Sequence, residues 1–505
     1  MGRTDNNESG TRPGFRGLGA WIPGLALVQR SPGRVIVFGG LGLWLATGLM
    51  HRIKPLPAGL DHMGSYAPAG EVAFLRDVTW LDGEGRRQVD QQIFDRVLEL
   101  VGQAESLLVL DQFLFNDYLG SATNALRPLS RELTEAIVRR RRERPDLECW
   151  FITDPINTVY GGQESALLER LRRAGVVVVP TRLTRLRDSN PLYSALWRLG
   201  LRAWPRRWGP MLPNPFGRGR VPLASVFELL NFKANHRKTV IADRGGVLTA
   251  LVSSANPHDG SSAHHNVALE FTGPAVRDLL ATEAAVCALS GQPVPEPPPA
   301  PASEPRAAAA DAPEVRVLTE NAIQRAVLDL IRGAQAGEEL DLAMFYLSSR
   351  PVVRALAGAQ RRGVRLRVLL DPNKDAFGRE KNGVPNRPAA AELVRAGVPV
   401  RWAATHGEQF HSKIIRHRAA DRESAILGSA NYTRRNLGNF NLETCVQLRG
   451  PAEAPVFRDM KHTMDRAWVN TDSRILSTDY AEYADSSFLH ALLYRIQEAT
   501  GLSTF

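Results

Sequence analysis

Two long stretches of the chain repeat the same order of amphipathic segments and short apolar runs. In each stretch an amphipathic segment of helical period comes first, an apolar run of strand length follows, and a second such pair ends in Asp-Pro. Apolar runs that alternate with helical segments are typical of β-α-β units in parallel or mixed sheets. The pattern predicts an α/β fold built from two duplicated domains. The equivalent segments are 92–103 and 323–335, 107–115 and 340–347, the dipeptides at 154–155 and 371–372, and the Arg-Ala-Gly-Val helix ends at 173–176 and 395–398.

A stretch rich in proline and alanine separates the two copies. Residues 291–313 contain eight prolines, and such a segment cannot pack a core, so we expect an extended spacer. The expected regions are a leader with an anchor at 1–68, a first domain at 69–290, the linker at 291–313, a second domain at 314–470 and a helical tail at 471–505.

An apolar run near the N-terminus, residues 35–50, is predicted to be a membrane anchor. Its 16 residues fall short of the ~20 that cross a bilayer, but Trp44 and the flanking basic residues extend its reach by snorkelling. Its four glycines are poor for a soluble helix and tolerated in a membrane helix. The alternative is a buried N-terminal helix. Because basic residues precede the run, one span predicts the later domains outside the cytoplasm, whereas a hairpin using residues 18–28 returns them inside.

The composition excludes several protein classes, and the net charge indicates what kind of partner the chain binds. With 505 residues, 44% of them hydrophobic, the chain is neither disordered throughout nor a polytopic membrane protein. Its three cysteines lie far apart, which excludes a disulfide framework and a thiolate zinc site. The net charge of +10 indicates an anionic partner, such as nucleic acid, an anionic membrane or a phosphate-bearing substrate. Only seven of the 63 basic residues are lysine, so each lysine is more informative than an arginine.

Each copy ends in the same set of polar residues. A His-x-Lys triplet opens a strand, a Ser-Ala-Asn turn follows the next strand, and Asn comes 20 residues after His in both copies. A glutamate follows the histidine by 34 residues in the first copy and by 32 in the second. Side chains two apart on a strand share a face, and a hairpin brings the Asn turn to the same sheet edge. The residues are His236, Lys238, Asn256 and Glu270 in the first copy and His411, Lys413, Asn431 and Glu443 in the second.

This combination of side chains suits a phosphodiester substrate. Lys and Asn bind the non-bridging oxygens, and His attacks phosphorus or protonates a leaving oxygen. The glutamate accepts from the other ring nitrogen, fixes the tautomer and supports the imidazolium. One His-x-Lys triplet is a common coincidence, but two with identical spacing in a duplicated fold are not. Both triplets also hold lysine in a chain that otherwise uses arginine, which indicates a requirement for a compact ammonium group.

On these motifs the chain resembles the phospholipase D superfamily, whose signature is a duplicated His-x-Lys motif with a downstream Asp and a Gly-Ser-x-Asn turn. The resemblance covers about residues 70–470. It implies two domains related by a pseudo-twofold axis, one active site between them, a phosphohistidine intermediate, and neither a metal nor another cofactor. It also implies that His236 is the nucleophile and His411 the acid. The further motif residues, expected to bind substrate, are Ser254, Ser429 and Asp243.

The second copy departs from the motif at one place. Its Asp position holds Arg418, and Asp421 is nearby but out of register. We take the Asp of this motif to have a structural role as well, so the departure affects a fold contact more than the chemistry.

Two further features bear on the substrate. The first copy is longer than the second before its His-x-Lys motif, and the extra segment, 181–225, mixes arginines with tryptophans. Such a segment suits an anionic membrane surface or single-stranded nucleic acid, and the alternative is a surface subdomain held by salt bridges. Lys374 and Lys381 follow the end of a predicted strand, where α/β sheets place ligand loops, and are expected to contact a headgroup or an acceptor alcohol.

The leading hypothesis is a membrane-anchored phosphatidyltransferase or phospholipase D, most similar to bacterial cardiolipin synthases. This resemblance implies a phospholipid substrate, an anionic membrane surface as partner and the bacterial inner membrane as location. The alternatives are a nucleic-acid phosphodiesterase on the same scaffold, which the anchor does not favour, and a membrane scaffold with a decayed site. We expect no metal site at His258, His264 and His265, because no carboxylate or cysteine spacing accompanies them. The sequence leaves open the phospholipid, the acceptor (water or an alcohol) and the oligomeric state.

Overall fold

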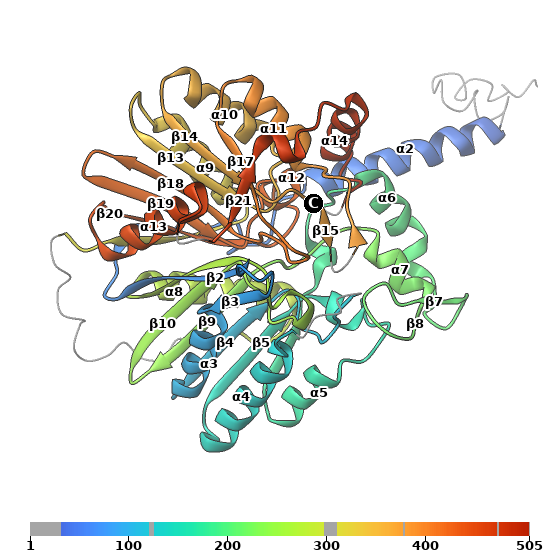
Figure 1. Ribbon diagram of the computed structural model, residues 1–505. Helices are drawn as coiled ribbons and strands as arrows, with labels where there is room; N and C mark the ends of the chain where they lie inside the picture. The colour runs from blue at the N-terminus through green and yellow to red at the C-terminus, as the bar shows by residue number, and fades with distance from the viewer. Residues whose placement is uncertain (1–31, 121–125, 297–310, 377–378, 472–473, 504–505) are drawn as a thin grey trace, which may run out of the picture.

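The computed structural model describes residues 32–120, 126–296, 311–376, 379–471 and 474–503. It contains two large β-sheets, one mainly from each half of the chain, and each of them carries helices of its own half on its outer side (Figure 1). Between the sheets lies a hydrophobic core to which both halves contribute. The predicted α/β class and the two-part organisation of the fold are confirmed.

The strands of the first half come in the order expected for repeated β-α-β units with a hairpin at the end. They are β2 (Val72–Leu81), β3 (Arg87–Gln91), β4 (Leu107–Gln112), β5 (Glu148–Thr153), β6 (Val177–Pro180), β9 (Lys238–Arg244), β10 (Val247–Ser253) and β11 (Asn266–Thr272). The strands of the second sheet are β1 (Ala67–Pro68), β12 (Glu314–Thr319), β13 (Glu339–Met344), β14 (Arg365–Leu370), β17 (Val400–Ala403), β18 (Lys413–Ala419), β19 (Arg422–Gly428), β20 (Thr444–Pro451) and β21 (Ser477–Asp479).

The strand order demonstrates the duplication. The first sheet runs β3-β2-β11-β10-β9-β4-β5-β6, and the second runs β1-β12-β20-β19-β18-β13-β14-β17-β21. When the edge strands β3, β1 and β21 are set aside, seven strands correspond one to one. In each half the central strand, β4 or β13, is parallel to one neighbour and antiparallel to the other. Both sheets are therefore mixed, as the sequence predicts.

The helices follow the same duplication. In the first half α3 (Ile93–Gln103), α4 (Leu129–Glu143) and α5 (Ala166–Arg173) pack in the outer core, and in the second half α9 (Asn321–Gly333), α10 (Arg350–Arg361) and α11 (Asn386–Arg395) do so. The helices α8 (Ala275–Ser290) and α13 (Pro455–Val469) contribute to the shared core. The Arg-Ala-Gly-Val segments end α5 and α11, and Gly175 and Gly397 adopt φ of 78° and 83°, where glycine is favoured.

The position of β4 inside the sheet, between β9 and β5, explains why its sequence is continuously apolar. Leu107 and Val109 point into the shared core, whereas Leu108 and Leu110 point into the outer core beneath α3 and α4. A strand that is buried on both faces needs apolar residues at successive positions. The apolar run therefore marks the middle of the sheet.

The expected domain limits differ from the structure at both ends of the chain. The segment that leads away from the anchor pairs with the second half, since β1 lies antiparallel to β12 and Met63 bridges to Leu318. The tail also joins this sheet through β21 and then forms α14 (Phe488–Thr500). The leader up to residue 31 and the linker residues 297–310 lie outside the described residues.

The inserted segment of the first half folds as a small subdomain beside the sheet. It contains α6 (Pro191–Leu199), β7 (Met211–Pro213), β8 (Arg220–Pro222) and α7 (Leu223–Leu229). Trp204 and Trp208 are exposed, but Trp197 is only 4% exposed and belongs to the packing of the subdomain. The other short elements, in the second half, are β15 (Asp375–Ala376), β16 (Arg379–Glu380) and α12 (Arg434–Leu437).

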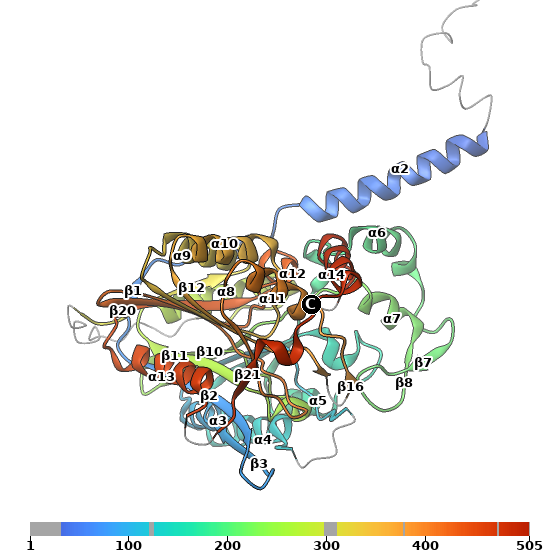
Figure 2. The same cartoon turned by 45° about the horizontal axis from the view of Figure 1, so that its top comes forward.

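The apolar run near the N-terminus forms a helix that projects from the body of the protein (Figure 2). This helix, α2 (Pro32–Ile53), has 22 residues and is longer than the 16-residue run. Among the described residues, its segment Gly33–Ile53 is the one helix long and apolar enough to cross a membrane, with a mean hydropathy of 1.5 and 11% burial. Its C-terminal part docks on α6, where the Trp44 indole donates to the carbonyl of Leu192 at 2.9 Å.

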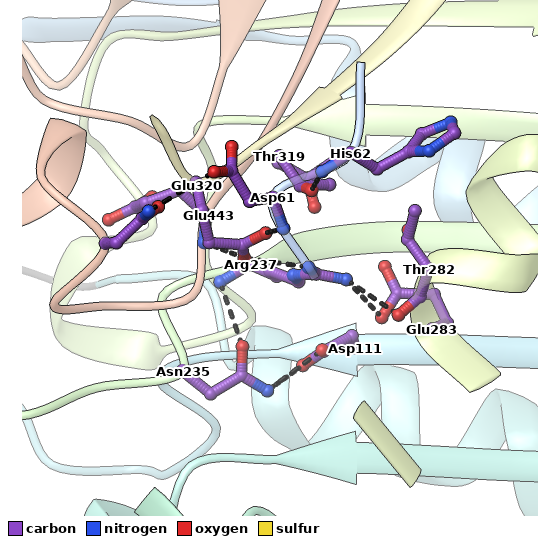
Figure 3. A network of polar contacts seen from close by, with 12 residues as sticks. Asp61, His62, Asp111, Asn235, Arg237, Thr282, Glu283, Thr319, Glu320 and Glu443 are labelled. Carbon is purple, nitrogen blue, oxygen red and sulfur yellow. Dashed lines mark hydrogen bonds and ion pairs between the residues drawn. The ribbon is translucent and has the colours of Figure 1, made fainter. Parts of the chain in front are cut away.

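A buried arginine, the middle residue of the His-x-Lys motif of the first half, joins the two halves (Figure 3). Arg237 donates from Nη2 to Glu320 Oε1 of the second half at 2.8 Å, and its Nη1 lies 3.5 Å from Glu283 Oε2. Glu320 also accepts from the backbone N–H groups of Asp61 and Glu443, at 2.9 and 3.2 Å. All three charged side chains of the ion pairs are fully buried. The network ties the anchor segment, the first half and the second half to one point.

Substitution of this arginine is expected to destabilise the fold strongly. Arg237→Leu leaves Glu283 and Glu320 buried without their cation, so we expect the free energy of unfolding to fall by about 3–5 kcal/mol. Arg418→Leu, which removes the exposed pair with Glu453, is the matched control and should cost about 1 kcal/mol or less. Urea unfolding followed by tryptophan fluorescence measures both, and equal losses would contradict the structural role of Arg237.

Candidate active site

The two His-x-Lys segments face each other across the junction between the halves. His236 and His411 stand two residues before Lys238 and Lys413, which begin β9 and β18. Each segment pairs with backbone of the opposite half. The His236 N–H donates to the carbonyl of Leu442 at 2.8 Å, and on the other side the His265 N–H donates to that of Gln409 at 3.0 Å. The junction that holds the halves together is therefore also the place where the histidines meet.

A buried aspartate orients each histidine segment from the neighbouring strand end. Asp154 Oδ2 accepts from the N–H of Asn235 at 2.7 Å, and Asp371 Oδ2 accepts from the N–H of Phe410, also at 2.7 Å. These are the aspartates of the two Asp-Pro dipeptides. Burial raises the pKa of Asp154 to about 7 and that of Asp371 to about 6. The sequence identified them as markers of the repeat, and the structure assigns them a positioning contact.

The histidines open into one pocket of about 530 Å³ between the halves. Polar and basic side chains line it together with apolar and aromatic ones. The polar and basic side chains include His236, His411, Asn256, Asn431, Lys233, Arg379, Lys381 and Arg435, and the apolar ones include Phe113, Leu114, Ile156, Phe216, Leu229, Phe232 and Phe345. The Oδ1 atom of Asn431 is buried and has no hydrogen-bond partner among the described residues, so it is available to a ligand.

Each lysine lies between its histidine and a phenylalanine ring. Lys238 Nζ donates to the carbonyl of His236 at 2.6 Å and sits 4.8 Å from the Phe113 ring centre. In the second half Lys413 Nζ donates to the carbonyl of His411 at 2.7 Å and sits 4.9 Å from the Phe345 ring centre. The rings also lie 4.7 and 4.8 Å from the two imidazoles.

These phenylalanines were missed by the sequence reasoning. Phe113 and Phe345 each stand one residue beyond the end of the central strand, β4 or β13. Their equivalent position at the ends of two repeated apolar runs is the signal that could have identified them. Each phenylalanine ring restricts the position of the neighbouring lysine ammonium group and leaves space for a compact cation only.

The two histidines have different partners at Nδ1. His236 Nδ1 lies 3.0 Å from Glu443 Oε2, a carboxylate of the opposite half. His411 Nδ1 lies 3.2 Å from Asn266 Oδ1, an amide oxygen of the opposite half. Both contacts favour a proton on Nδ1 and leave Nε2 available for chemistry. Only His236 has a negative charge to support its imidazolium.

Asn266 occupies the position in the first half that Glu443 occupies in the second. Ser254 Oγ donates to Asn266 Oδ1 at 3.0 Å, and Ser429 Oγ donates to Glu443 Oε2. The N–H of Val267 donates to Ser254 Oγ, and the N–H of Thr444 donates to Ser429 Oγ, both at 3.0 Å. Ser254 and Ser429, expected to bind substrate, thus hold the partners of the histidines.

Glu270 does not occupy the position that its spacing suggests. It lies within β11 and forms an ion pair with Arg96 of α3, with Arg96 Nη2 2.8 Å from Oε1. The equivalent of Glu443 is Asn266, four residues earlier. Spacing along the chain pointed to the nearest glutamate, whereas the strand register presents Asn266 to His411.

Asp243 also lies away from the pocket, contrary to the substrate-binding expectation. It is the next-to-last residue of β9 and accepts from Ser106 Oγ and, at 2.9 Å, from the N–H of Gly246. Its role is to close the β9–β10 hairpin. In the second half Arg418 stands in the place of this aspartate and pairs with Glu453 at 2.9 Å.

The two loop lysines separate in the structure. Lys381 lines the pocket and donates to the Tyr346 hydroxyl. Lys374 is not among the lining residues and donates to the Tyr483 hydroxyl at 3.2 Å. His258 and His264 line the pocket as well, and among the described residues no group of three or more His, Cys, Asp or Glu is arranged to hold a metal ion.

The electrostatics of the pocket favour an anionic ligand. Burial lowers the pKa of His236 to about 4 and that of Lys238 to about 7. The pKa values of His411 and Lys413 are held well below their usual range, first by burial and then by neighbouring cations. Glu443, whose ionisation burial opposes, still has a lowered pKa because His236 and Lys238 lie beside it. A bound phosphodiester would supply the missing negative charge and raise the pKa values of the bases.

Comparison with known proteins finds a family match within the second half. A family model described as the phospholipase D-like domain of cardiolipin synthase matches residues 327–468. Among curated protein sequences, none matches the chain. The resemblance to the phospholipase D superfamily is thereby confirmed for residues 327–468, which match this domain.

Solved structures match the chain at low sequence identity, and the first of the three below shares its fold. Phosphatidylserine synthase from Haemophilus influenzae Rd KW20 matches at 12% identity and a TM-score of 0.51, over 88% of this chain and 96% of that one. Polyphosphate kinase from Porphyromonas gingivalis matches at 15% identity and a TM-score of 0.44, over 85% of this chain, which spans about half (53%) of that one. Nuc, a phospholipase D family member from Salmonella typhimurium, matches at 21% identity and a TM-score of 0.26, over 33% of this chain and 98% of that one.

The contacts of the lysines predict that arginine cannot replace them. Lys238→Arg and Lys413→Arg keep the charge but put a larger, flat cation between the histidine carbonyl and the phenylalanine ring. We expect each to lower kcat by ~10²-fold or more, as for other electrostatic contacts in a transition state. Lys461→Arg, on α13 and paired with Asp465, is the matched control and should leave the rate unchanged. Full activity in the two active-site variants would contradict the requirement for lysine.

Proposed function

We propose that this phospholipase D-like chain is a membrane-anchored enzyme that transfers or hydrolyses the phosphatidyl group of a phospholipid. The observation that supports it most is the meeting of His236 and His411, one from each half, in a single pocket, each with a buried lysine bonded to its carbonyl oxygen. One imidazole as nucleophile and a second as acid is the minimum set for exchange at a phosphodiester without release of a free intermediate. The proposed enzyme is similar to cardiolipin synthases in its second domain.

The unequal partners of the histidines support a division of roles. His236 is the proposed nucleophile: its Nε2 attacks phosphorus, the bond from phosphorus to the headgroup oxygen breaks, and Glu443 supports the positive ring that results. His411 gives its Nε2 proton to the departing headgroup oxygen. Neutral His411 then takes the proton of an acceptor hydroxyl, whose oxygen attacks phosphorus as the bond to His236 breaks. The cycle returns both rings to their starting states.

Two features favour a lipid over a nucleic acid as substrate. Part of the pocket lining is apolar and aromatic, with Phe113, Phe216 and Phe232 among its residues, which suits the glycerol and acyl region of a phospholipid. The helix α2 also has the length and composition of a membrane span, with nine-tenths of its most apolar part unburied. We propose that α2 anchors the chain in the bacterial inner membrane beside its substrate.

A direct comparison of the two substrates tests this function. The purified full chain is incubated with vesicles of phosphatidylglycerol and, separately, with single-stranded DNA. We expect glycerol release from the lipid, with phosphatidic acid as product when water is the acceptor and cardiolipin when a second phosphatidylglycerol is. His236→Ala and His411→Ala should each lower the rate by at least ~10²-fold.

His417→Ala is the control for these variants and should keep its activity. His417 lies on β18, pairs with Glu338 and does not line the pocket. Cleavage of DNA with no turnover of lipid would overturn the lipid assignment. Near-normal activity in either pocket variant would overturn the shared site.

The role of His411 as acid predicts a shift in the pH profile. Asn266→Asp puts a carboxylate beside His411 Nδ1 and so favours the imidazolium, raising its pKa by about 1–3 units. Since the alkaline limb of kcat/KM reports loss of the acid, this limb should move to higher pH.

A substrate with a good leaving group provides the control. With a p-nitrophenyl phosphodiester the leaving oxygen needs no proton, so Asn266→Asp should leave the alkaline limb unchanged. If the acidic limb moved instead, His411 would be the nucleophile and the roles would be reversed.

A further inference from the structure

A second cavity of about 840 Å³ lies between the end of α2 and the inserted subdomain. It has no lining residue in common with the active-site pocket. Its lining contains no histidine or cysteine, so it carries no nucleophile of the kind found in the active site. The cavity is therefore a candidate for binding and not for chemistry.

The lining of this cavity has a large excess of positive charge. Glu228 is its one acidic residue, and this carboxylate lies 3.6 Å from Arg206. No other cation of the cavity is within ion-pair distance of a carboxylate in the described part of the chain. The basic lining residues are Lys54, Arg182, Arg185, Arg202 and Arg206.

The nearest buried carboxylate is already neutralised and cannot serve the cavity. Asp188 is fully buried and bound on one side by Arg198, at 2.8 Å, and on the other by Lys233, at 2.5 Å. The Trp197 ring lies between Arg198 and Arg202, 5.9 and 5.8 Å from their guanidinium carbons. These contacts build a fixed wall and leave Arg202 facing the cavity. Burial, followed by the charge of Arg198, lowers the pKa of Lys54 to about 8, although Asp188 opposes this shift.

The position of the cavity specifies the kind of anion. Lys54 directly follows α2, the candidate membrane span, and this helix is fixed to α6 by Trp44 and by the close approach of Gly48, where a Cβ would come within 3.0 Å of the Pro191 carbonyl. Exposed apolar side chains continue from α2 over the subdomain. They are Leu192, Leu196, Leu199, Trp204 and Trp208, with 39–56% of their surface exposed. A basic cavity bordered by such side chains at the end of a membrane span matches an anionic phospholipid, with its headgroup among the arginines and its chains along α2 and α6.

We infer that this cavity is a non-catalytic binding site for an anionic phospholipid, whose phosphodiester is held by Arg182, Arg185 and Arg202. The inference stands apart from the proposed reaction, because it needs only the charge of the lipid and the position of α2. Helix α7 lies between the two cavities. Ala224 and Glu228 line the lipid cavity, whereas Leu229 lines the active-site pocket. A lipid bound here would hold α7, which also lines the active-site pocket, close to the bilayer.

Native mass spectrometry of the full chain tests the site without any turnover. The chain carries His236→Ala and His411→Ala, so that no lipid is consumed, and is kept in neutral detergent with added phosphatidylglycerol or phosphatidylcholine. We expect one tightly bound phosphatidylglycerol to be lost when Arg182, Arg185 and Arg202 are all changed to Gln. Half-occupancy of this copy should need at least ~10-fold more lipid, given the several charge-assisted contacts removed.

Two sets of variants control for charge and for folding. Arg139→Gln, Arg142→Gln and Arg173→Gln remove the same charge from the exposed surface of α4 and α5 and should keep the bound lipid. Changing Arg182, Arg185 and Arg202 to Lys keeps the charge and should restore most of the binding. Equal lipid binding by the cavity variant and the surface variant would overturn the proposal.

Two further arms distinguish the source of the phosphate. Inorganic phosphate at millimolar concentration should not displace the lipid, because it lacks the acyl chains, and full displacement would reduce the cavity to a simple phosphate site. A gel shift with single-stranded DNA should be the same for both Gln variants. A shift lost only in the cavity variant, with lipid binding intact, would make the cavity a nucleic-acid site and overturn the lipid assignment.

Discussion

The active site depends on two backbone hydrogen bonds that cross from one half of the chain to the other. The N–H of His236 donates to Leu442, and the N–H of His265 donates to Gln409. Each bond carries one histidine segment to the strand of the opposite half that bears its Nδ1 partner. Neither half contains a complete histidine couple by itself, so the candidate active site forms only when the two halves associate. The buried contacts of Arg237 with Glu283 and Glu320 lie directly beneath this junction and hold it in place.

The two halves have the same fold, but one pair of equivalent residues differs between them. Strand order, lysines, phenylalanines and the aspartates at the strand ends correspond between the halves, but Glu443 has Asn266 as its counterpart. The amide keeps the ring orientation of His411 and withholds the charge that would favour its imidazolium. A ring that gives up its proton readily and a ring that tolerates a positive charge are suited to different steps. The single change of carboxylate to amide is thus enough to distinguish two otherwise equivalent histidines.

Much of the fold and of the reactive residues could be predicted from the sequence, because repetition made the signal independent of any one motif. The α/β class, the duplication, the membrane-length helix and the meeting of two His-Lys pairs all follow from local periodicity and matched spacing. The partner of His411 did not, since the contact crosses between halves and a count along the chain selected Glu270, which the strand register directs to Arg96. Trp197 belongs to the inserted segment, whose mixture of arginines and tryptophans suggests a surface contact, yet this side chain is only 4% exposed and its ring lies beside Arg198 and Arg202. Contacts between side chains, which a count along the chain does not show, decided both cases.

The pairing of β1 with β12 has a consequence for the order of events during synthesis. Ala67 lies opposite Val315, so the segment that leaves the anchor helix is made long before its partner strand. At ~5–20 residues per second, the ribosome needs roughly 10–50 s to reach that partner. During this interval all strands of the first sheet have been made, while β1, which follows α2, waits with an unpaired edge. Pairing of that edge is a late step, and it joins the segment after α2 to the half of the protein that is synthesised last.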